Sequence, residues 1–175
     1  NPDYLQPETN TSSIQFRSIP LDENNKSWGI PLSYAAKERL INKLSQGTVE
    51  LKVNINTKIY PSEELTVIAE VKGSKFPNER LVFSAHVQEP GANDNATGVG
   101  VALEMAAVTA DFVKRGSLSP KRTLTFLWGD EILSTRRYVK EDSIRAQDIK
   151  WGISLDMVGE NTAVTGGSFL IEKMP

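Results

Sequence analysis

The sequence predicts an α/β fold in which helices cover the faces of a mixed, mostly parallel sheet. Between residues 81 and 157, short apolar runs typical of buried strands alternate with longer segments of helical periodicity. Such alternation is typical of crossover connections between neighbouring strands. With 175 residues, of which 39% are hydrophobic and 24% charged, the chain also has the size and composition to bury a core.

The first part of the chain predicts few regular elements. Residues 1–30 are polar and irregular. A helix is expected over residues 34–46, because Ser33 is a suitable N-cap, apolar residues recur at helical spacing and Gly47 can end the helix. Residues 48–60 alternate between apolar and polar side chains, which predicts a half-buried strand.

The remaining elements alternate along the rest of the chain. We expect strands at residues 65–71, 81–85, 123–128, 149–157 and 162–172, and helices at residues 97–114 and 134–141. A turn is predicted at residues 76–79. The apolar positions of the helix at 97–114 form a broad face, so this helix is expected to be largely buried against the sheet.

Composition excludes several classes of function. The net charge of −2 gives no electrostatic basis for binding nucleic acid or an anionic membrane. No run approaches the roughly 18 consecutive apolar residues of a membrane span. The absence of cysteine removes disulfides and thiolate chemistry. A metal site would therefore use carboxylates and the single histidine, His86, a donor set that favours zinc or a similar divalent ion.

Polar side chains follow three predicted strands at the point where each strand ends. If these strands are parallel neighbours, one histidine and four carboxylates gather at one edge of the sheet: His86, Asp94, Asp130, Glu131 and Asp156. Such carboxylates repel one another, and divalent cations are the simplest compensation. On His86 and Asp94 alone, a core histidine beside an ordinary strand, turn and helix N-cap is an equally good interpretation.

Four motifs together resemble metallopeptidase family twenty-eight, the co-catalytic zinc aminopeptidase and glutamate carboxypeptidase group. They are His86, the loop P-G-A-N-D-N-A-T-G at 90–98, W-G-D-E at 128–131 and L-D-M-V-G at 155–159. The resemblance covers roughly residues 64–160. It implies a three-layer α/β/α sandwich with a mixed, mostly parallel central sheet, incomplete at the C-terminus, and a site for two zinc ions.

Matched residue by residue, the resemblance implies a role for each polar side chain. His86 and Asp156 would be ligands of one metal, Asp94 would bridge both metals, and Glu131 would be a ligand of the other metal. Asp130 would be the general base that takes a proton from water. The resemblance also implies a cis peptide bond after Asp94.

The sequence departs from the family pattern in three places. Asp130 stands where the family usually has a glutamate base. Gln88 stands where an aspartate usually orients the first histidine. No second histidine is present before Pro175 to complete the metal shared with Glu131. We therefore expect the sequence to be a fragment that lacks the last ligand.

The resemblance implies a zinc-dependent exopeptidase, in first place an aminopeptidase, acting on peptides through a metal-activated water. The alternative is a non-catalytic metallopeptidase-like domain that serves in binding or scaffolding, as Asp130 and Gln88 suggest. Residues 1–58 are expected to be a peripheral segment containing the tail of a protease-associated domain, and residues 59–175 a truncated catalytic domain. A secreted, periplasmic or cell-envelope location is also expected, since the chain begins without an initiator methionine.

Overall fold

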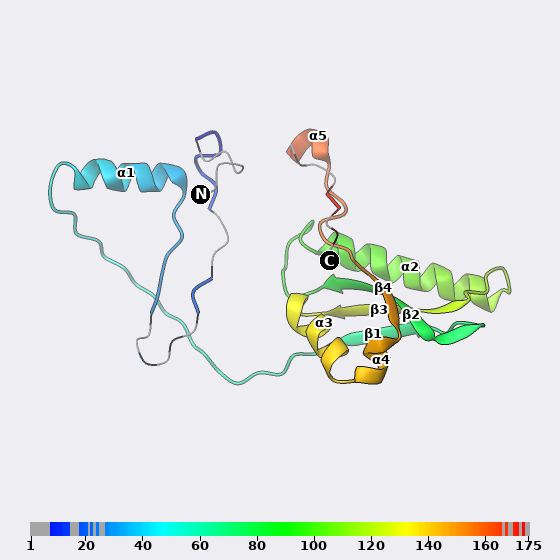
Figure 1. The fold of residues 1–175 in the computed structure, drawn as a ribbon. Helices are drawn as coiled ribbons and strands as arrows, with labels where there is room; N and C mark the ends of the chain where they lie inside the picture. Colours follow the sequence, from blue (N-terminus) through cyan, green and yellow to red (C-terminus); the bar gives the residue numbers. More distant parts are fainter. Residues whose placement is uncertain are drawn as a thin grey trace. The chain divides into compact units, whose positions relative to one another are not determined.

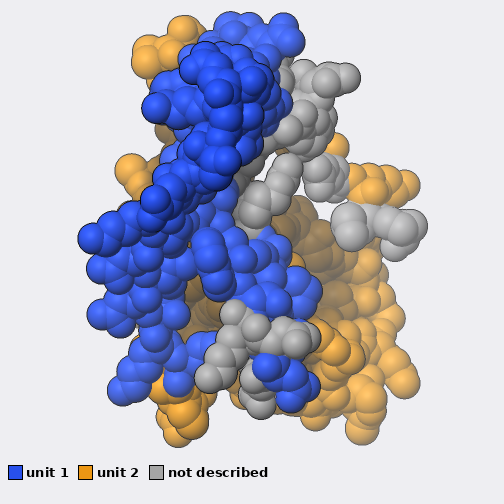
Figure 2. Space-filling model, turned by 90° about the vertical axis from the view of Figure 1, so that its left-hand side faces the viewer, with its two compact units in different colours: residues 1–59 blue, residues 60–175 orange. Residues whose placement is uncertain are grey.

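A computed structural model of the chain describes residues 8–14, 18–20, 22, 24, 27–165, 167, 170, 171 and 173 (Figure 1). The chain divides into two compact units, residues 1–59 and residues 60–175, which Figure 2 colours separately. Each unit is described by itself below.

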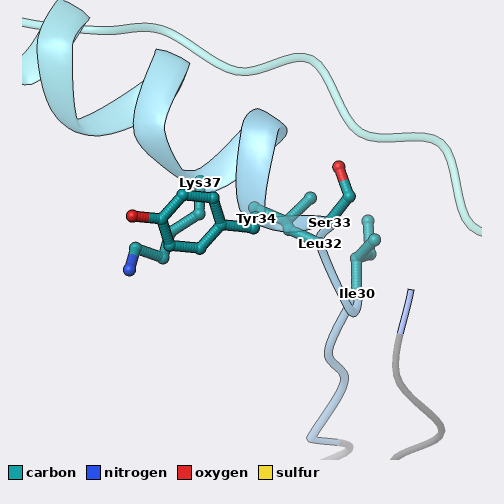
Figure 3. Close-up of a pocket in the computed structure, with 5 residues that line it drawn as sticks. All are labelled: Ile30, Leu32, Ser33, Tyr34 and Lys37. Atoms are coloured by element: carbon teal, nitrogen blue, oxygen red, sulfur yellow. The ribbon is translucent and has the colours of Figure 1, made fainter. Parts of the chain in front are cut away.

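The first unit contains one helix among its described residues, α1 (Tyr34–Leu44). Ser33 caps this helix as predicted, since its hydroxyl oxygen accepts a hydrogen bond from the Ala36 amide at 3.2 Å. None of the α1 residues is buried. A hollow of about 270 Å³ adjoins the start of the helix and is lined by Ile30, Leu32, Ser33, Tyr34 and Lys37 (Figure 3).

The strand predicted at residues 48–60 is wrong, because these residues form neither strand nor helix. An alternating sequence forms a strand only where a neighbouring strand takes up its backbone hydrogen bonds. No strand among the described residues pairs with this segment, and residues 50–60 are all exposed. The alternating segment therefore has no neighbouring strand to pair with in the described part of this unit.

The second unit is built on a sheet of four strands in the order β1-β3-β2-β4. The strands are β1 (Val67–Val71), β2 (Phe76–His86), β3 (Arg122–Gly129) and β4 (Ile149–Ser154). β2 runs parallel to both β3 and β4, whereas β1 is antiparallel to β3. The mixed, mostly parallel sheet is thus confirmed, and β4 forms an edge on which residues 150–154 are exposed.

Helices cover both faces of this sheet, which confirms the three-layer α/β/α arrangement (Figure 1). On one face α2 (Ala96–Lys114) packs through Ala102 against a cluster that includes Phe83 and Phe126, whose rings stack at 5.3 Å. On the other face lie α3 (Glu131–Lys140) and the short α4 (Ser143–Gln147), and Tyr138 of α3 packs with Val82 and Leu127. Successive side chains of β2 therefore point to opposite faces of the sheet and pack against different helices.

Helix α2 is less buried than expected, since only Gly98 and Ala102 are buried among its residues. Apolar side chains on its other side are exposed, among them Leu103 at 60% and Phe112 at 45%. Within the described part of the chain, α2 is the one helix long and apolar enough to cross a membrane by length and composition alone. The same properties belong to helices that cover a sheet, and α2 packs on this sheet through Ala102.

The strands and helices predicted between residues 65 and 157 are present with shifted ends. The turn predicted at residues 76–79 is wrong: the chain turns at residues 72–75, and β2 already begins at Phe76. A register shift between Phe76 and Arg80 accommodates Pro77, because proline is tolerated where ladder hydrogen bonds are interrupted.

The strand predicted at residues 162–172 is wrong at its start, where residues Thr162–Thr165 form the short helix α5. The Asn161 side-chain oxygen accepts a hydrogen bond from the Ala163 amide at 3.2 Å, and such local capping favours a helical turn over an extended chain. Residues 166, 168, 169 and 172 of that prediction lie outside the described residues.

Candidate metal centre

The ends of three parallel strands meet at one edge of the sheet. His86, the last residue of β2, is paired in register with Gly129, the last residue of β3. On the other side of β2, Ser84 is paired with Ser154, the last residue of β4. The side chains that follow β3 and β4 in sequence therefore begin next to the histidine.

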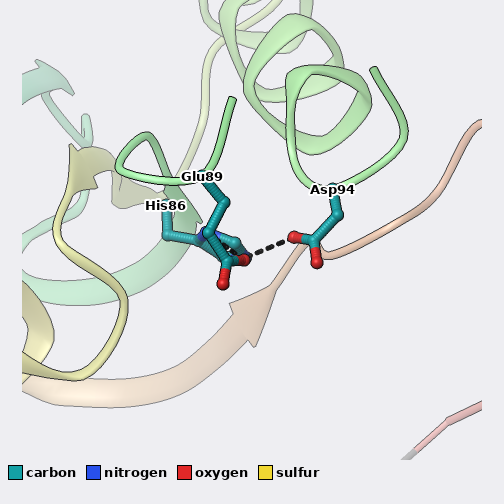
Figure 4. Close-up of side chains that lie close together, drawn as sticks. All are labelled: His86, Glu89 and Asp94. Atoms are coloured by element: carbon teal, nitrogen blue, oxygen red, sulfur yellow. Dashed lines mark ion pairs between the residues drawn. The ribbon is translucent and has the colours of Figure 1, made fainter. Parts of the chain in front are cut away.

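His86 is buried and directs one ring nitrogen toward two carboxylates. Its Nε2 lies 3.4 Å from Asp94 Oδ1 and 3.2 Å from Asp156 Oδ1. The structure thus brings together three of the predicted site residues, one from the end of β2, one from the loop before α2 and one from the segment after β4. In Figure 4 the Asp94 carboxylate points across the loop toward the imidazole.

Glu89 joins this cluster, although the sequence had not indicated it. Its Oε2 lies 3.6 Å from His86 Nδ1. His86, Glu89 and Asp94 each offer a ligand atom, and these atoms lie within 4.8 Å of one another (Figure 4). The position of Glu89 ahead of Pro90 and Gly91 is the one signal, since a turn there folds the loop back on His86.

The proximity of two carboxyl groups perturbs Glu89. A hydrogen bond to the Asp94 carboxylate raises the pKa of Glu89 above its ordinary value, and partial burial raises this pKa further. Two ionised carboxylates in such contact repel each other, and a cation beside them offsets this repulsion. The pair therefore has the electrostatic character of a cation site.

Asn95 holds the loop that carries Asp94. This side chain is fully buried, and its Nδ2 donates to the Leu155 carbonyl at 2.9 Å. Its Oδ1 accepts from the Gly98 amide at 3.1 Å and from the Met157 amide at 3.2 Å. Asn95 therefore joins the start of α2 to the segment that contains Asp156, and the peptide bond before it is cis, as the resemblance implied.

Asp130 and Glu131 lie at the neighbouring strand end. Neither belongs to the group of metal-binding geometry found among the described residues, although the Glu131 charge is near enough to raise the pKa of Glu89. Asp130 caps α3, which begins three residues earlier than predicted, and its Oδ1 accepts from the Leu133 amide at 3.4 Å. The Glu131 amide donates to Gln88 Oε1 at 3.2 Å. Gln88 therefore contacts the start of α3.

A second set of contacts fixes the backbone of Asp130. Glu64 accepts hydrogen bonds from the Thr66 hydroxyl at 2.6 Å, from the Asp130 amide and from Arg137, with which it forms an ion pair. The Thr66 hydroxyl, followed by Arg137, holds the pKa of Glu64 below its ordinary value of 4.5. A hollow of about 420 Å³ adjoins this network and is lined by Ser62, Glu63, Glu64, Leu65, Val87, Gln88, Asp130 and Leu133.

The residues of the cluster fit a zinc ion by their chemistry. Imidazole nitrogen and carboxylate oxygen are ligands that zinc accepts. Among the described residues, His86 Nδ1 and Asp94 Oδ1 are buried without a hydrogen-bond partner. Buried polar atoms are normally satisfied, so a cation on Asp94 and an acceptor on His86 Nδ1 would complete the site.

Comparisons with known proteins identify relatives of this chain. The family model of Peptidase family M28 matches residues 66–166. A probable zinc metalloprotease of Pyrenophora teres f. teres is 30% identical over 124 residues, which are 62% of this chain and 25% of that protein. Carboxypeptidase Q of Rattus norvegicus is 30% identical over 89 residues, 47% of this chain and 18% of that protein.

Aminopeptidase NAALADL1 of Mus musculus is 27% identical over 85 residues, which are 47% of this chain and 11% of that protein. The chain thus spans about a quarter of the length of the fungal relative and less of the two mammalian proteins.

Proposed function

Because the chain belongs to peptidase family M28, a family of zinc metallopeptidases, we propose that it forms part of a zinc-dependent exopeptidase, and specifically of an aminopeptidase. The observation that carries this proposal is that His86 Nε2 faces the carboxylates of Asp94 and Asp156 at 3.4 Å and 3.2 Å. These groups come from different strand ends, and packing alone gives no reason for such a set at one edge of the sheet.

In this proposal His86, Asp94 and Asp156 would hold one zinc ion, and Asp94 and Glu131 would hold a second. Zinc supplies a Lewis acid for the peptide carbonyl when it is bound. Asp130 takes the proton of the attacking water and delivers it to the leaving amine. The hydrogen bond from Leu133 uses Oδ1 of Asp130, so this role falls to Oδ2.

The charges near the cluster support an aminopeptidase rather than a carboxypeptidase. An aminopeptidase has to bind a protonated α-amino group, whereas a carboxypeptidase has to bind an α-carboxylate. Glu89 belongs to the cluster, and Glu63 lines the hollow beside Asp130. Arg137 of α3 is paired with Glu64 and Glu141. The surroundings therefore favour a cationic group of the substrate.

Zinc analysis and peptide hydrolysis test this proposal. We expect the metal-free chain to take up zinc in equilibrium dialysis, Asp94→Ala to abolish the uptake, and Asp130→Ala to retain it. The natural protein is expected to release p-nitroaniline from a leucyl anilide, and Asp130→Ala to lose this activity. Asp111→Asn is the control, since it removes one exposed carboxylate from the far end of α2. A wild-type chain without zinc after dialysis would contradict the proposal.

The second candidate is a metal-binding domain without hydrolytic activity. The capping bond of Asp130 and the contact of Gln88 with the Glu131 amide favour it, because both side chains then have structural partners. This candidate predicts that zinc binds and that neither amino-terminal nor carboxy-terminal substrates are cleaved. Turnover that depends on Asp130 excludes it.

Two expectations beyond the metal centre also remain proposals. Residues 1–58 are proposed to be a peripheral segment with the tail of a protease-associated domain. If so, limited proteolysis should cleave these residues from the rest of the chain and leave that remainder folded. The natural protein is proposed to be secreted, periplasmic or in the cell envelope. Fractionation of the cells that make it tests this location, and recovery in the cytosol would contradict it.

A further inference from the structure

The two nitrogens of the His86 ring face different groups. Nε2 faces Asp94 and Asp156, whereas Nδ1 faces Glu89 Oε2 at 3.6 Å. We propose that Glu89 is a positioning residue that accepts the Nδ1 proton of His86 and thereby fixes the ring for metal binding through Nε2. This inference rests on the proposed zinc site and names a residue that holds its histidine.

The chemistry of imidazole requires an acceptor at this position. A neutral imidazole carries one N–H, so a ring that binds a metal through Nε2 has its proton on Nδ1. Histidines that bind metals usually donate this second N–H to a carboxylate, a carbonyl or water, which fixes the ring orientation. His86 is 5% exposed and its Nδ1 is buried, so bulk water does not supply the acceptor.

Glu89 is the group that the described structure offers for this role. Gln88, at the position where the family usually places an orienting aspartate, accepts from the Glu131 amide at 3.2 Å. The carboxylates of Asp94 and Asp156 lie on the Nε2 side of the ring. The Glu89 side chain is 32% exposed, so it has room to close the 3.6 Å separation to hydrogen-bond length.

A cation on the Nε2 side strengthens this arrangement. The Asp94 and Glu89 carboxyl groups lie close together, so they repel each other when both are ionised. A cation held by Asp94 offsets the repulsion between the two carboxylates. Glu89 is then able to keep its negative charge while it accepts from Nδ1, and a charged acceptor makes the stronger hydrogen bond.

The competing role for Glu89 is that of a direct metal ligand, since its carboxylate, His86 and Asp94 offer atoms within 4.8 Å of one another. A metal held by Glu89 and Nδ1 would leave the proton on Nε2, whereas a metal held by Glu89 and Nε2 would leave the Nδ1 proton without Glu89 as its acceptor. The tautomer of His86 tests the first arrangement, and the exchange of the Nδ1 proton in Glu89→Ala tests the second.

The chain has a single histidine, so nuclear magnetic resonance of ¹⁵N-histidine-labelled protein reports on His86 alone. With zinc bound, we expect a protonated Nδ1 and an unprotonated Nε2. Glu89→Ala should speed the exchange of the Nδ1 proton with solvent and weaken zinc binding by about 10- to 100-fold. Glu89→Gln keeps the size of the side chain and an acceptor oxygen, so it should retain part of the protection of this proton.

Asp111→Asn is the matched control for loss of one negative charge, and backbone amide spectra show whether each variant is folded. A proton on Nε2 with zinc bound would overturn the inference in favour of the ligand role. Unchanged exchange of the Nδ1 proton in Glu89→Ala would overturn it, whether or not this variant binds zinc more weakly. A wild-type chain that takes up no zinc would instead refute the proposed function on which the inference rests.

Discussion

Replacing Asn95 tests whether one buried amide holds the candidate site together. In Asn95→Ala the chain loses three hydrogen bonds, to the Leu155 carbonyl and from the Gly98 and Met157 amides. At about 1 kcal/mol for each bond, the free energy of unfolding of residues 60–175 should fall by about 3 kcal/mol. A loss of this size corresponds to roughly 10 °C in the melting temperature.

Urea unfolding followed by tryptophan fluorescence measures this loss, because Trp128 and Trp151 lie in the same unit as Asn95. Asn78→Ala is the control, since residue 78 is exposed, and it should change the unfolding free energy by less than about 0.5 kcal/mol. Asn95→Asp keeps the acceptor for both amides but turns a carboxylate toward the Leu155 carbonyl, so it should also destabilise the unit. An Asn95→Ala variant as stable as Asn78→Ala would refute this reasoning.

Three further outcomes are expected. Glu64→Gln should reduce stability at pH 7, and the difference from wild type should shrink as the pH falls from the ordinary pKa of about 4.5 through the lowered pKa of the folded state, because the ionised Glu64 stabilises the fold; a stability difference that stays constant as the pH falls from 7 through this range contradicts this. Gly98→Ala should cost about 1–3 kcal/mol in chemical denaturation, since the added Cβ would lie 2.3 Å from the Leu155 oxygen, whereas Gly100→Ala meets no atom within 4 Å and should not. Zinc at about 100 times its dissociation constant should raise the stability by about 2.7 kcal/mol, and a chelator should reverse this; an unchanged melting curve argues against specific binding to the folded chain.

The sheet was predictable because its signals are local. Residues 81–85 and 123–128 form short, mostly apolar runs, and the intervening helical periodicity indicates a crossover between parallel strands. The alternation at residues 48–60 is as clear, yet it forms no strand, because pairing depends on a partner elsewhere in the chain. The local pattern of apolar residues therefore indicates which segments are able to form strands. Hydrogen bonding to a neighbouring strand decides which of these segments do so.

The sequence allowed us to predict which strand ends carry the site residues, but not the contacts that these residues make. His86, Asp94 and Asp156 come together because they follow adjacent strands of the sheet. Glu89 reaches His86 only because the loop folds back, and that path is fixed by bonds from Asn95 to residues about sixty positions later. An aspartate before a helix is compatible with an N-cap and with a general base. The sequence alone therefore did not indicate that Asp130 caps α3.

The edge position of β4 has a consequence for how quickly the site can open. β3 and the end of β2 are buried between neighbouring strands, whereas residues 150–154 of β4 are exposed. Local opening begins where few contacts hold the backbone, so amide protons of β4 should exchange with deuterium before those of β3. His86 stands on an inner strand and Asp156 follows the edge strand. A bound ion would therefore be released when β4 and Asp156 move away, while His86 remains in place on β2. The rate at which β4 opens would then set the lifetime of the complex.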